Sequence, residues 1–264
     1  MDYQKICEAS IEVVKKAAQF IKDNLGKVAD SQIEDKSINS LVSYVDKTAE
    51  EILVAGLKEI MPQATFVTEE ETVVSERSEY YWIIDPLDGT TNFLHQLPFF
   101  SISVALVHQD KVVTGIVYEV NRDECFYAWG NNKAYLNGRE IRVSRNTDLI
   151  NALIATGFPY TRLEKLDAHL EMIKYLKFNA RGLRRLGSAA LDLAFVAAGR
   201  FDGYFEYGLN AWDVAGGTFL VQQAGGKVTD FEGGDQFLFS GELVTGSIPI
   251  QKELLDLVQK TIYS

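Results

Sequence analysis

A run of aromatic and β-branched residues, YYWII at positions 80–84, ends in a turn that leaves the chain little conformational freedom. Such a run is typical of a buried β-strand. Directly after it, Pro86 fixes φ and Gly89 permits a positive φ, so the sequence predicts a tight, rigid loop. The loop carries two carboxylates three residues apart, Asp85 and Asp88. They either bind a hard cation or cap the turn through its backbone, and the loop alone does not distinguish the two.

The size and charge of the chain limit its partners. With 264 residues, of which 47% are hydrophobic and 24% charged, it can bury a core for one large domain or two closely packed ones. Its 26 basic and 37 acidic residues give a formal net charge of −11. An anionic ligand meets a repulsive field unless bound cations reverse that field locally. We therefore expect no direct binding of nucleic acid and no binding to membranes.

Cysteine usage and the N-terminal segment indicate a compartment. Cys7 and Cys125 are far apart and lack C-x-x-C spacing, so we expect free, buried thiols. Residues 1–5 include an acid and lead into an amphipathic pattern rather than the apolar run of a signal peptide. No apolar run is long enough to span a bilayer. The sequence predicts a cytoplasmic protein.

Two amphipathic helices open the chain. Apolar residues recur at helical spacing from Ile6 to Ile21, and Gly26 is placed to end the first helix. A second helix is expected from Asp46 to about Ile60. Strand-like segments follow at residues 66–67, 81–84, 101–108, 111–119 and 124–129. The last three are joined by short polar turns, as in an antiparallel meander.

From about Leu149, strands and helices alternate. The pattern predicts a strand at 152–156, helices at 162–176 and 188–198, a strand at 204–207, a helix at 212–224 and a closing helix that starts at Pro249. The first half, residues 1–145, therefore has an α+β pattern, and the second half, residues 146–264, an α/β pattern. We expect them to form two tightly packed halves or one domain, with a ligand site at their interface.

Further acids lie outside the loop. Glu69 begins a run of three glutamates after the strand at 66–67, and this run is either part of a site or a solvated acidic patch. Asp213 opens an otherwise apolar helix, where it either joins a site or interacts favourably with the helix dipole. Asp46 is expected to be the N-cap of the second helix. Taken singly, each of these acids is ambiguous.

In combination, three segments resemble one family over nearly the whole chain. They are the acid after a strand at Glu69, DPLDGTTNF at residues 85–93, and WDVAGG at residues 212–217. The chain is similar to the magnesium-dependent, lithium-sensitive inositol monophosphatases and their phosphatase relatives, whose loop D-P-[IL]-D-G-T-T-N-F it matches at every position. The resemblance implies a mixed α+β and α/β fold, a layered αβαβα sandwich of the sugar-phosphatase type, and a homodimer.

The resemblance also implies a cluster of magnesium ligands. Glu69, Asp85 and the carbonyl group of Leu87 match the ligands of one Mg²⁺. Asp85, Asp88 and Asp213 match those of a second, with Asp85 bridging. A third ion would bind Glu69 through water, so two or three Mg²⁺ are expected. Oxygen ligands without histidine or cysteine suit magnesium rather than zinc. Without a cation, acids this close would raise one another's pKa.

The residues after Asp88 are expected to hold the phosphate group. Gly89, Thr90 and Thr91 lead into a predicted helix, so the backbone N–H groups of Gly89 and Thr90 can point at a phosphate. By resemblance, the Thr90 hydroxyl orients the attacking water with Asp46 as its partner, and the catalytic residues are Glu69, Thr90 and Asp46.

Substrate selection is assigned, by resemblance, to the second half. The segment RLGSAA at residues 185–190, together with Glu206, matches the family's contacts to sugar or inositol hydroxyl groups. The implied substrate-binding residues are Gly89, Thr90, Thr91, Gly187, Ser188, Ala189, Glu206 and Asp213. The less favoured alternative from the residues alone is that Gly187 is only a helix-start glycine and Arg184-Arg185 only a solvated pair.

Two segments depart from the family pattern. Where the family has Gly-Glu-Glu, this chain has Thr68-Glu69-Glu70 followed by one more acid, Glu71, so the metal ligand could shift from Glu69 by one residue. The segment VTGS at residues 244–247 stands where relatives read close to A-S-N. We expect both departures to affect loop geometry and substrate choice.

The predicted reaction is metal-assisted hydrolysis of a phosphate monoester by in-line attack of water, without a phosphoenzyme. The expected substrate is inositol 1-phosphate, and fructose 1,6-bisphosphate and 3′(2′),5′-bisphosphate nucleotides are alternatives in the same superfamily. Phosphatases that form an aspartyl phosphate have a similar motif, D-x-D-G-T, but their two acids share one face of a strand. The alternative from another class is a mainly regulatory, protein-binding role.

Overall fold

The strands of the first half form one sheet in the computed structural model, which describes residues 1–37, 40–73, 76–159 and 163–262. The sheet has seven strands in the order β3-β4-β5-β6-β7-β8-β9. Their bounds are β3 Thr65–Thr68, β4 Tyr80–Asp88, β5 Ser101–His108, β6 Lys111–Glu119, β7 Glu124–Trp129, β8 Ala134–Leu136 and β9 Arg139–Ile141. β3 is parallel to β4, and every later pair is antiparallel. The predicted meander and its strand bounds are confirmed.

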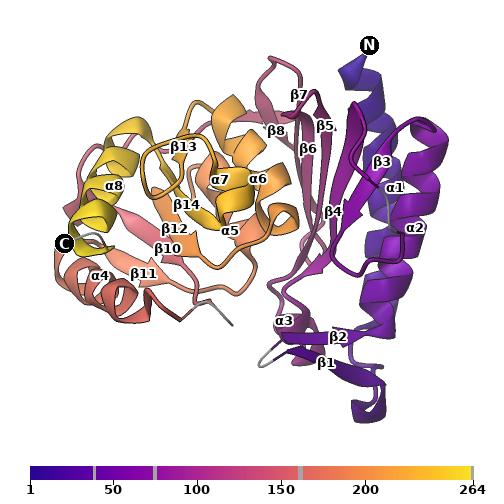
Figure 1. Ribbon diagram of the computed structural model, residues 1–264, viewed down its shortest axis with the longest axis horizontal. Helices are drawn as coiled ribbons and strands as arrows, with labels where there is room; N and C mark the ends of the chain where they lie inside the picture. Colours follow the sequence, from indigo (N-terminus) through magenta and orange to yellow (C-terminus); the bar gives the residue numbers. More distant parts are fainter. Residues whose placement is uncertain (38–39, 74–75, 160–162, 263–264) are drawn as a thin grey trace.

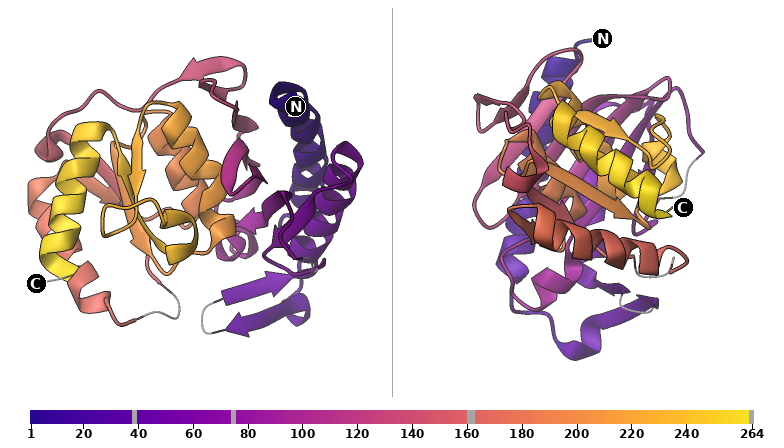
Figure 2. Two further views of the ribbon diagram at one scale, coloured as in Figure 1. Left: turned by 45° about the horizontal axis from the view of Figure 1, so that its top comes forward. Right: turned by 90° about the vertical axis from the view of Figure 1, so that its left-hand side faces the viewer.

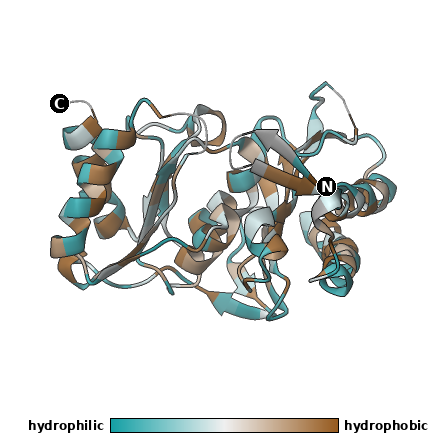
Figure 3. Ribbon diagram, turned by 90° about the horizontal axis from the view of Figure 1, so that it is seen from below, coloured by the Kyte–Doolittle hydropathy of each residue, from teal (hydrophilic) through white to brown (hydrophobic). Residues whose placement is uncertain are grey.

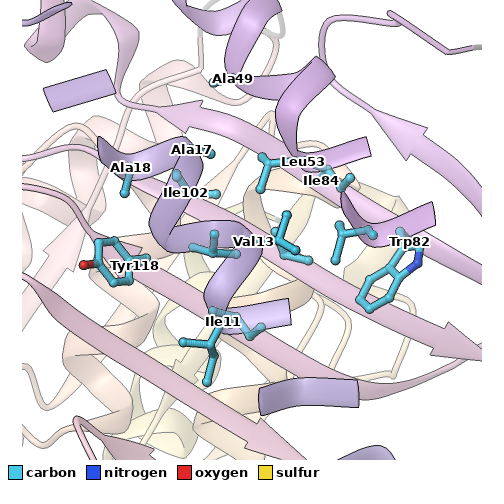
Figure 4. Packing of buried hydrophobic residues seen from close by; sticks show 14 of the residues in the cluster. Ile11, Val13, Ala17, Ala18, Ala49, Leu53, Trp82, Ile84, Ile102 and Tyr118 are labelled. Carbon is cyan, nitrogen blue, oxygen red and sulfur yellow. The ribbon is translucent and has the colours of Figure 1, made fainter. Parts of the chain in front are cut away.

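Two long helices cover one face of this sheet. They are α1, Tyr3–Asn24, and α2, Tyr44–Ile60. Their apolar faces, which include Val13 and Leu53, join one buried cluster with Trp82 and Ile102 of the sheet (Figure 4). The two helices pack so closely that a Cβ atom at Gly56 would lie 2.6 Å from Val13 Cγ1. This contact holds α2 against α1, and α2 in turn supports the pocket described below.

The other face of the seven-stranded sheet packs on a central pair of helices, α5 and α6 (Figure 1). α5 spans Ala189–Ala197 and α6 spans Ala211–Gln223. Both are buried on almost every side, as helices between two sheets must be. On their far side lies a mixed five-stranded sheet in the order β11-β10-β12-β14-β13. Its strands are β10 Leu153–Thr156, β11 Gly182–Arg184, β12 Gly203–Tyr207, β13 Lys227–Thr229 and β14 Glu242–Gly246.

The last layer covers the outer face of the five-stranded sheet. It consists of α4, Leu166–Asn179, and α8, Ile248–Ile262. Residues of both helices share a buried cluster with the sheet. In Figure 3 the outermost helices carry both teal and brown ribbon, as helices with one solvent-facing side do. The order of layers is α1/α2, sheet, α5/α6, sheet, α4/α8, and this confirms the layered αβαβα fold that the family resemblance implied.

A two-stranded hairpin that the sequence did not predict lies at one end of the molecule. Its strands are β1 Ile33–Ser37 and β2 Ser40–Ser43, paired antiparallel. Both views of Figure 2 place the hairpin beyond the ends of the two sheets. β2 contacts the short helix α3, Thr90–Leu94, which follows the Asp85–Gly89 loop, and leads directly into α2. The hairpin therefore borders the loop that carries the candidate ligands.

Some predicted boundaries shift in the structure. Helix α4 begins at Leu166, and the predicted start at Arg162 lies outside the described residues. Helix α8 begins at Ile248, one residue before Pro249. The sequence also missed β8, β9, β11, β13, β14 and the short helix α7, Phe237–Ser240. The division of the chain into halves at residue 145 stays a prediction.

Two expectations from composition can be compared with the structure. Cys7 and Cys125 are free and buried, as predicted. Burial raises the pKa of the Cys125 thiol to about 12, so this thiol is unreactive at neutral pH. Among the described residues, no helix is both long enough and apolar enough to cross a membrane.

The contact between α5 and α6 yields a prediction about stability. A Cβ atom at Gly217 would lie 2.5 Å from Leu193 Cβ, so the helices meet where no side chain fits. We expect Gly217→Val to lower the free energy of unfolding by about 1–3 kcal/mol, because overpacking forces neighbouring groups to shift. Urea denaturation measures the change. Gln222→Val, at an exposed position of the same helix, is the matched control. Equal stability of the Gly217 variant and the wild type would contradict the close contact.

Candidate active site

The end of β4 brings Asp85 and Asp88 to a pocket. Asp85 pairs with Ser103 of β5 and Asp88 with Ser101, so three steps along β4 oppose two along β5. This bulge bends the strand and turns its side chains. Asp85 Oδ1 accepts a hydrogen bond of 3.0 Å from the Leu87 N–H, so one oxygen of Asp85 does cap the turn. Capping and ligand binding are compatible, since a carboxylate has a second oxygen.

Four carboxylates from distant parts of the chain line this pocket: Glu69 after β3, Asp85 and Asp88 on β4, and Asp213 in the first turn of α6. Burial raises the pKa of Asp85 well above its ordinary value, and the neighbouring acids raise it further. Burial raises the pKa of Asp88 to about 6. It also raises the pKa of Asp213, to which the charges of Asp88 and Glu69 add. The cluster lacks positive charge, and a bound cation would supply it.

The chemistry of these donors fits a hard cation. All four are carboxylates, the ligands that Mg²⁺ and Ca²⁺ prefer. Within the described ranges, no three histidine, cysteine, aspartate or glutamate side chains are placed so that together they could hold one metal ion. Asp213 Oδ2 instead accepts the Asn210 N–H at 2.6 Å, and Asp88 Oδ2 is held in a similar way by α5. The backbone thus brings the acids together, while their side chains are partly held by protein donors.

The structure shows which residue of the three-glutamate run lies at the pocket. Glu69 lines the pocket, whereas Glu70 and Glu71 are not among its lining residues in the described structure. The Glu70 N–H donates to Glu50 Oε2 at 2.8 Å, which fixes the backbone beside Glu69. The shift by one residue that the extra glutamate allowed is therefore not needed. The role of Glu69 as a metal ligand stays a prediction.

Helix α2 positions Thr90 through Asp46. The prediction that Asp46 is the N-cap is wrong, because Ser43 is the N-cap and Asp46 is the third residue of the helix. Asp46 Oδ2 accepts the N–H and the hydroxyl of Ser43, at 2.9 and 2.7 Å, which completes a capping box. Its other oxygen, Oδ1, accepts the Thr90 hydroxyl at 2.8 Å. Asp46 therefore stands behind Thr90, and Thr90 lines the pocket.

Glu50, one turn after Asp46, is a supporting residue that the sequence did not reveal. Its carboxylate is fully buried and accepts the backbone N–H groups of Glu70 and Thr72, both at 2.8 Å, and the Thr72 hydroxyl at 2.7 Å. One face of α2 thus holds the loop after β3 through Glu50 and the loop after β4 through Asp46. Glu50 lies three and seven residues before the buried Leu53 and Leu57, so an acid on the apolar face of this helix was the sequence signal that could have marked it.

Hydrogen bonds to α5 and its preceding loop join the two sides of the pocket. Ser188 is the N-cap of α5, and its hydroxyl lies 2.7 Å from Asp88 Oδ2, which also accepts the Ala190 N–H at 2.6 Å. The Asn92 amide donates to the carbonyl oxygens of Phe99 and Leu186, at 2.7 and 2.8 Å. The Asn92 amide therefore holds the loop before Gly187 against α3.

Gly89 turns the chain from β4 into α3 with a φ of +100°, which favours glycine. A Cβ atom here would also lie 2.9 Å from the Phe99 carbonyl oxygen. The residue has room for no side chain, so its backbone can border the pocket directly. Gly89, Thr90 and Thr91 all line the pocket, and their role in holding a phosphate group stays a prediction.

Glu206 extends from β12 into the same pocket. Its Oε2 accepts the Tyr204 hydroxyl at 2.6 Å, and both carboxylate oxygens lie where a Cβ atom at Gly157 would be. Gly157 is therefore needed for this side-chain position. Burial raises the pKa of Glu206 to about 7, although the Tyr204 hydroxyl and the charge of Arg185 lower it.

The pocket has a volume of about 520 Å³, large enough for a small phosphorylated polyol. Every predicted metal-binding and substrate-binding residue lines it, and only Asp46 among the predicted site residues lies behind it. Arg185 of the matched RLGSAA segment also lines the pocket. The lining residues that the sequence did not assign to the site are Leu41, Asn92, His95, Thr156, Gly157, Phe158, Asp192, Gly208, Leu209 and Asn210. The VTGS segment at 244–247 is not part of this lining.

Glu206 gives a prediction about pH. Its folded-state pKa, about 7, lies above the ordinary value of 4.5, so folding favours its protonated form. Wild-type stability therefore falls as the pH rises through this interval. The variant Glu206→Gln mimics the protonated form and avoids this loss. We expect the melting temperature of the variant, minus that of the wild type, to increase between pH 5 and pH 8 in the presence of a chelator. A constant or shrinking difference would contradict the raised pKa.

Comparisons with known proteins agree with the residue pattern and the fold. A model of the inositol monophosphatase family matches residues 2–263. An inositol-1-monophosphatase of Mesorhizobium japonicum is 40% identical over 253 residues, 96% of this chain and 95% of that protein. A Nus factor SuhB of Pasteurella multocida is 40% identical over 251 residues, 95% of this chain and 94% of that protein. The crystal structure of an extragenic suppressor protein, suhB of Bartonella henselae, covers 97% of this chain and 98% of its own with a TM-score of 0.91 and 38% identity. The chain belongs to the inositol monophosphatase family.

Proposed function

We propose that the chain hydrolyses the phosphate monoester of a small polyol or sugar in a Mg²⁺-dependent reaction, with inositol 1-phosphate as the first substrate. The observation that carries this proposal is the convergence of Glu69, Asp85, Asp88 and Asp213 on one pocket, beside the Gly89–Thr91 segment. The name of the Mesorhizobium relative supports the choice of substrate. Fructose 1,6-bisphosphate and 3′(2′),5′-bisphosphate nucleotides are the other substrates to test.

The four acids and the Leu87 carbonyl oxygen would hold two or three Mg²⁺. When bound, Mg²⁺ lowers the pKa of water and neutralises charge on the phosphate and on the leaving oxygen. Such neutralisation matters here, because the formal charge of the chain is −11 and the pocket is lined by further acids.

Thr90 would orient the attacking water. The Thr90 hydroxyl has two acceptors in the protein, Asp46 Oδ1 at 2.8 Å and the Leu87 carbonyl oxygen at 3.1 Å, so its proton is used there and its oxygen would accept a hydrogen bond from water. Asp46 is itself fixed by Ser43, so Thr90 has one preferred rotamer. A water held in this way presents its own lone pair to the phosphorus atom.

Other residues of the pocket would bind the rest of the substrate. The N–H groups of Gly89 and Thr90 would donate to the phosphate oxygens, and they favour no particular alcohol. Glu206, which lines the same pocket, would accept a hydroxyl group of the sugar or polyol, since the Tyr204 hydroxyl occupies only one of its acceptor positions. The acid cluster and the Gly89–Thr91 segment would thus serve the reaction, and Glu206 the choice of alcohol.

A mechanism through an aspartyl phosphate is less compatible with these contacts. Asp85 is 1% exposed and its Oδ1 is held by the Leu87 N–H, which lowers its strength as a nucleophile. Turnover in ¹⁸O-labelled water, with a search for a phosphorylated aspartate, tests this. A trapped phosphate on Asp85 would overturn direct attack by water.

A second candidate function is a regulatory, protein-binding role in the cytoplasm, which the relatives named Nus factor SuhB favour. The absence of phosphate release from inositol, sugar and nucleotide phosphates in the presence of Mg²⁺ would favour this role. We also propose a homodimer, and light scattering of the purified chain measures the oligomeric state.

The proposed ligand set predicts the behaviour of Asp88→Asn. Mutation of a residue that only supports a metal ligand typically lowers activity by about 10- to 100-fold. Removal of a direct ligand should therefore lower kcat by about 100-fold or more. The fold should survive, because asparagine keeps an acceptor for Ser188 and Ala190 and relieves charge repulsion. Added Mg²⁺ should raise the melting temperature of the wild type and not that of the variant.

The matched control is Asp256→Asn, at an exposed position of α8, which makes the same change of charge. It should retain wild-type kcat. Near-normal kcat in Asp88→Asn would refute the assignment of Asp88.

Lithium gives an independent test of the proposed metal chemistry. The family resemblance leads us to expect inhibition of phosphate release by Li⁺ at millimolar concentration, with Na⁺ at the same ionic strength as the control. Phosphate release that Li⁺ leaves unchanged would argue against the proposed metal site.

A further inference from the structure

Asp192 has a buried carboxylate that the protein does not satisfy. It lies on α5, one turn after Ser188, and is 2% exposed. In the described part of the chain, its buried Oδ1 has no hydrogen-bond partner. The side chain nevertheless lines the same pocket as the acid cluster and Glu206. An orphaned acceptor next to a ligand pocket requires an explanation.

Other buried carboxylates of the described residues have donors. Asp46 and Glu50 accept hydroxyl and backbone donors on α2 and its neighbouring loops. Asp230 accepts three backbone N–H groups, from Glu232, Gly234 and Gln236. Glu119 accepts from Asn121 and Arg122. A purely structural carboxylate is normally paired in this way. The unpaired carboxylate oxygen of Asp192 therefore indicates a hydrogen-bond donor that arrives with the ligand.

The position of Asp192 identifies which part of the ligand it would meet. Its N–H donates to the Ser188 carbonyl oxygen at 3.0 Å, so Ser188 and Asp192 lie one above the other on the first turn of α5. Ser188 contacts Asp88 at the end of the pocket where the phosphate would sit. Asp88, Asp192 and Glu206 line the same pocket. The charges of Glu206 and Asp88 both raise the pKa of Asp192, after burial itself, so Asp192 is within electrostatic range of both carboxylates.

The chemistry of this position limits the ligand group. A carboxylate accepts hydrogen bonds, so the ligand must bring a donor, either a hydroxyl or an ammonium group. Arg185 lines the same pocket and its charge already lowers the pKa of Asp192, so a second full cation is not required. Glu206 is another acceptor a short way along the pocket. Two acceptor carboxylates in one pocket suit a ligand with two neighbouring hydroxyl groups.

We propose that Asp192 is a specificity-determining residue, which accepts a hydrogen bond from a second hydroxyl group of the substrate, beside the hydroxyl bound by Glu206. This inference rests on the proposed phosphatase function and narrows it to polyhydroxylated alcohols. It assigns the reaction to the acid cluster and the choice of a diol over a simple alcohol to Asp192 and Glu206 together.

The first experiment compares two substrates in the Mg²⁺-loaded full chain. Inositol 1-phosphate carries hydroxyl groups next to the ester, whereas p-nitrophenyl phosphate carries none. Hydrogen bonds to a charged group contribute about 1.5–3 kcal/mol, so Asp192→Asn should lower kcat/KM for inositol 1-phosphate by about 10- to 100-fold, mainly through KM. For p-nitrophenyl phosphate, kcat/KM should stay within about twofold of wild type. Glu206→Gln should show the same selectivity, and Asp256→Asn should change neither substrate.

The second experiment measures stability without substrate or metal. Because the Asp192 carboxylate is buried without a donor to Oδ1, Asp192→Asn should not lower the melting temperature. Asp230→Asn is the contrasting control, since it weakens three backbone hydrogen bonds to a carboxylate and should lower the melting temperature. A marked loss of stability in Asp192→Asn would show that the residue is structural and would overturn the inference.

The remaining outcomes are also decisive. Equal losses of kcat/KM with both substrates would show that Asp192 supports the reaction itself and not the choice of alcohol. No loss with either substrate would show that Asp192 does not contact the substrate. Either result overturns the inference. If Asp192→Asn lowers activity only with a phosphate ester that carries an amine, the donor on the ligand is an ammonium group and not a hydroxyl. That result would overturn the inference as well. If the wild type releases phosphate from neither substrate, the proposed function fails, and the inference fails with it.

Discussion

The burial of several carboxylates in one pocket is the constraint on which the rest of the structure depends. Each acid loses water and gains like-charged neighbours, and both effects oppose its ionised form. Backbone N–H groups of separate elements donate hydrogen bonds to these carboxylates. They belong to Leu87 in the loop, Ala190 on α5 and Asn210 before α6. Only a fold that brings the first sheet and the central helices to the same point can supply them together.

The sequence predicted best those features that local pattern determines. Strands β5, β6 and β7 have the predicted bounds, because consecutive antiparallel strands with short turns form from neighbouring segments. The short strands β8, β9, β11 and β13 were missed, because three residues are too few to show a period of two. The hairpin β1–β2 was missed because its segment, IEDKS, lacks the apolar alternation of a half-buried strand.

The sequence predicted some residues of the candidate site and missed others, for similar reasons. The residues predicted as metal ligands and substrate contacts line the pocket, and those between Asp85 and Thr91 do so because one short, rigid loop carries them. Asp46 was placed at the wrong position of its helix, because Ser43 and Asp46 are both good capping residues and only their reciprocal bonds show which is the N-cap. Glu50 and Asp192 were missed, although each is an acid within the apolar pattern of its helix. The groups that Glu50 binds lie 20 and 22 residues away, and no local pattern records such contacts.

The seating of α2 has a consequence for distant mutations. This helix touches the site at two points, through Asp46 and Glu50, and is pressed against α1 at Gly56, near its other end. A rigid helix transmits a displacement along its length. A bulky residue at the α1–α2 contact would therefore move the loops after β3 and β4 at the same time. Inherited variation at this contact would then look like a loss of catalysis, although the altered residue is far from any substrate atom.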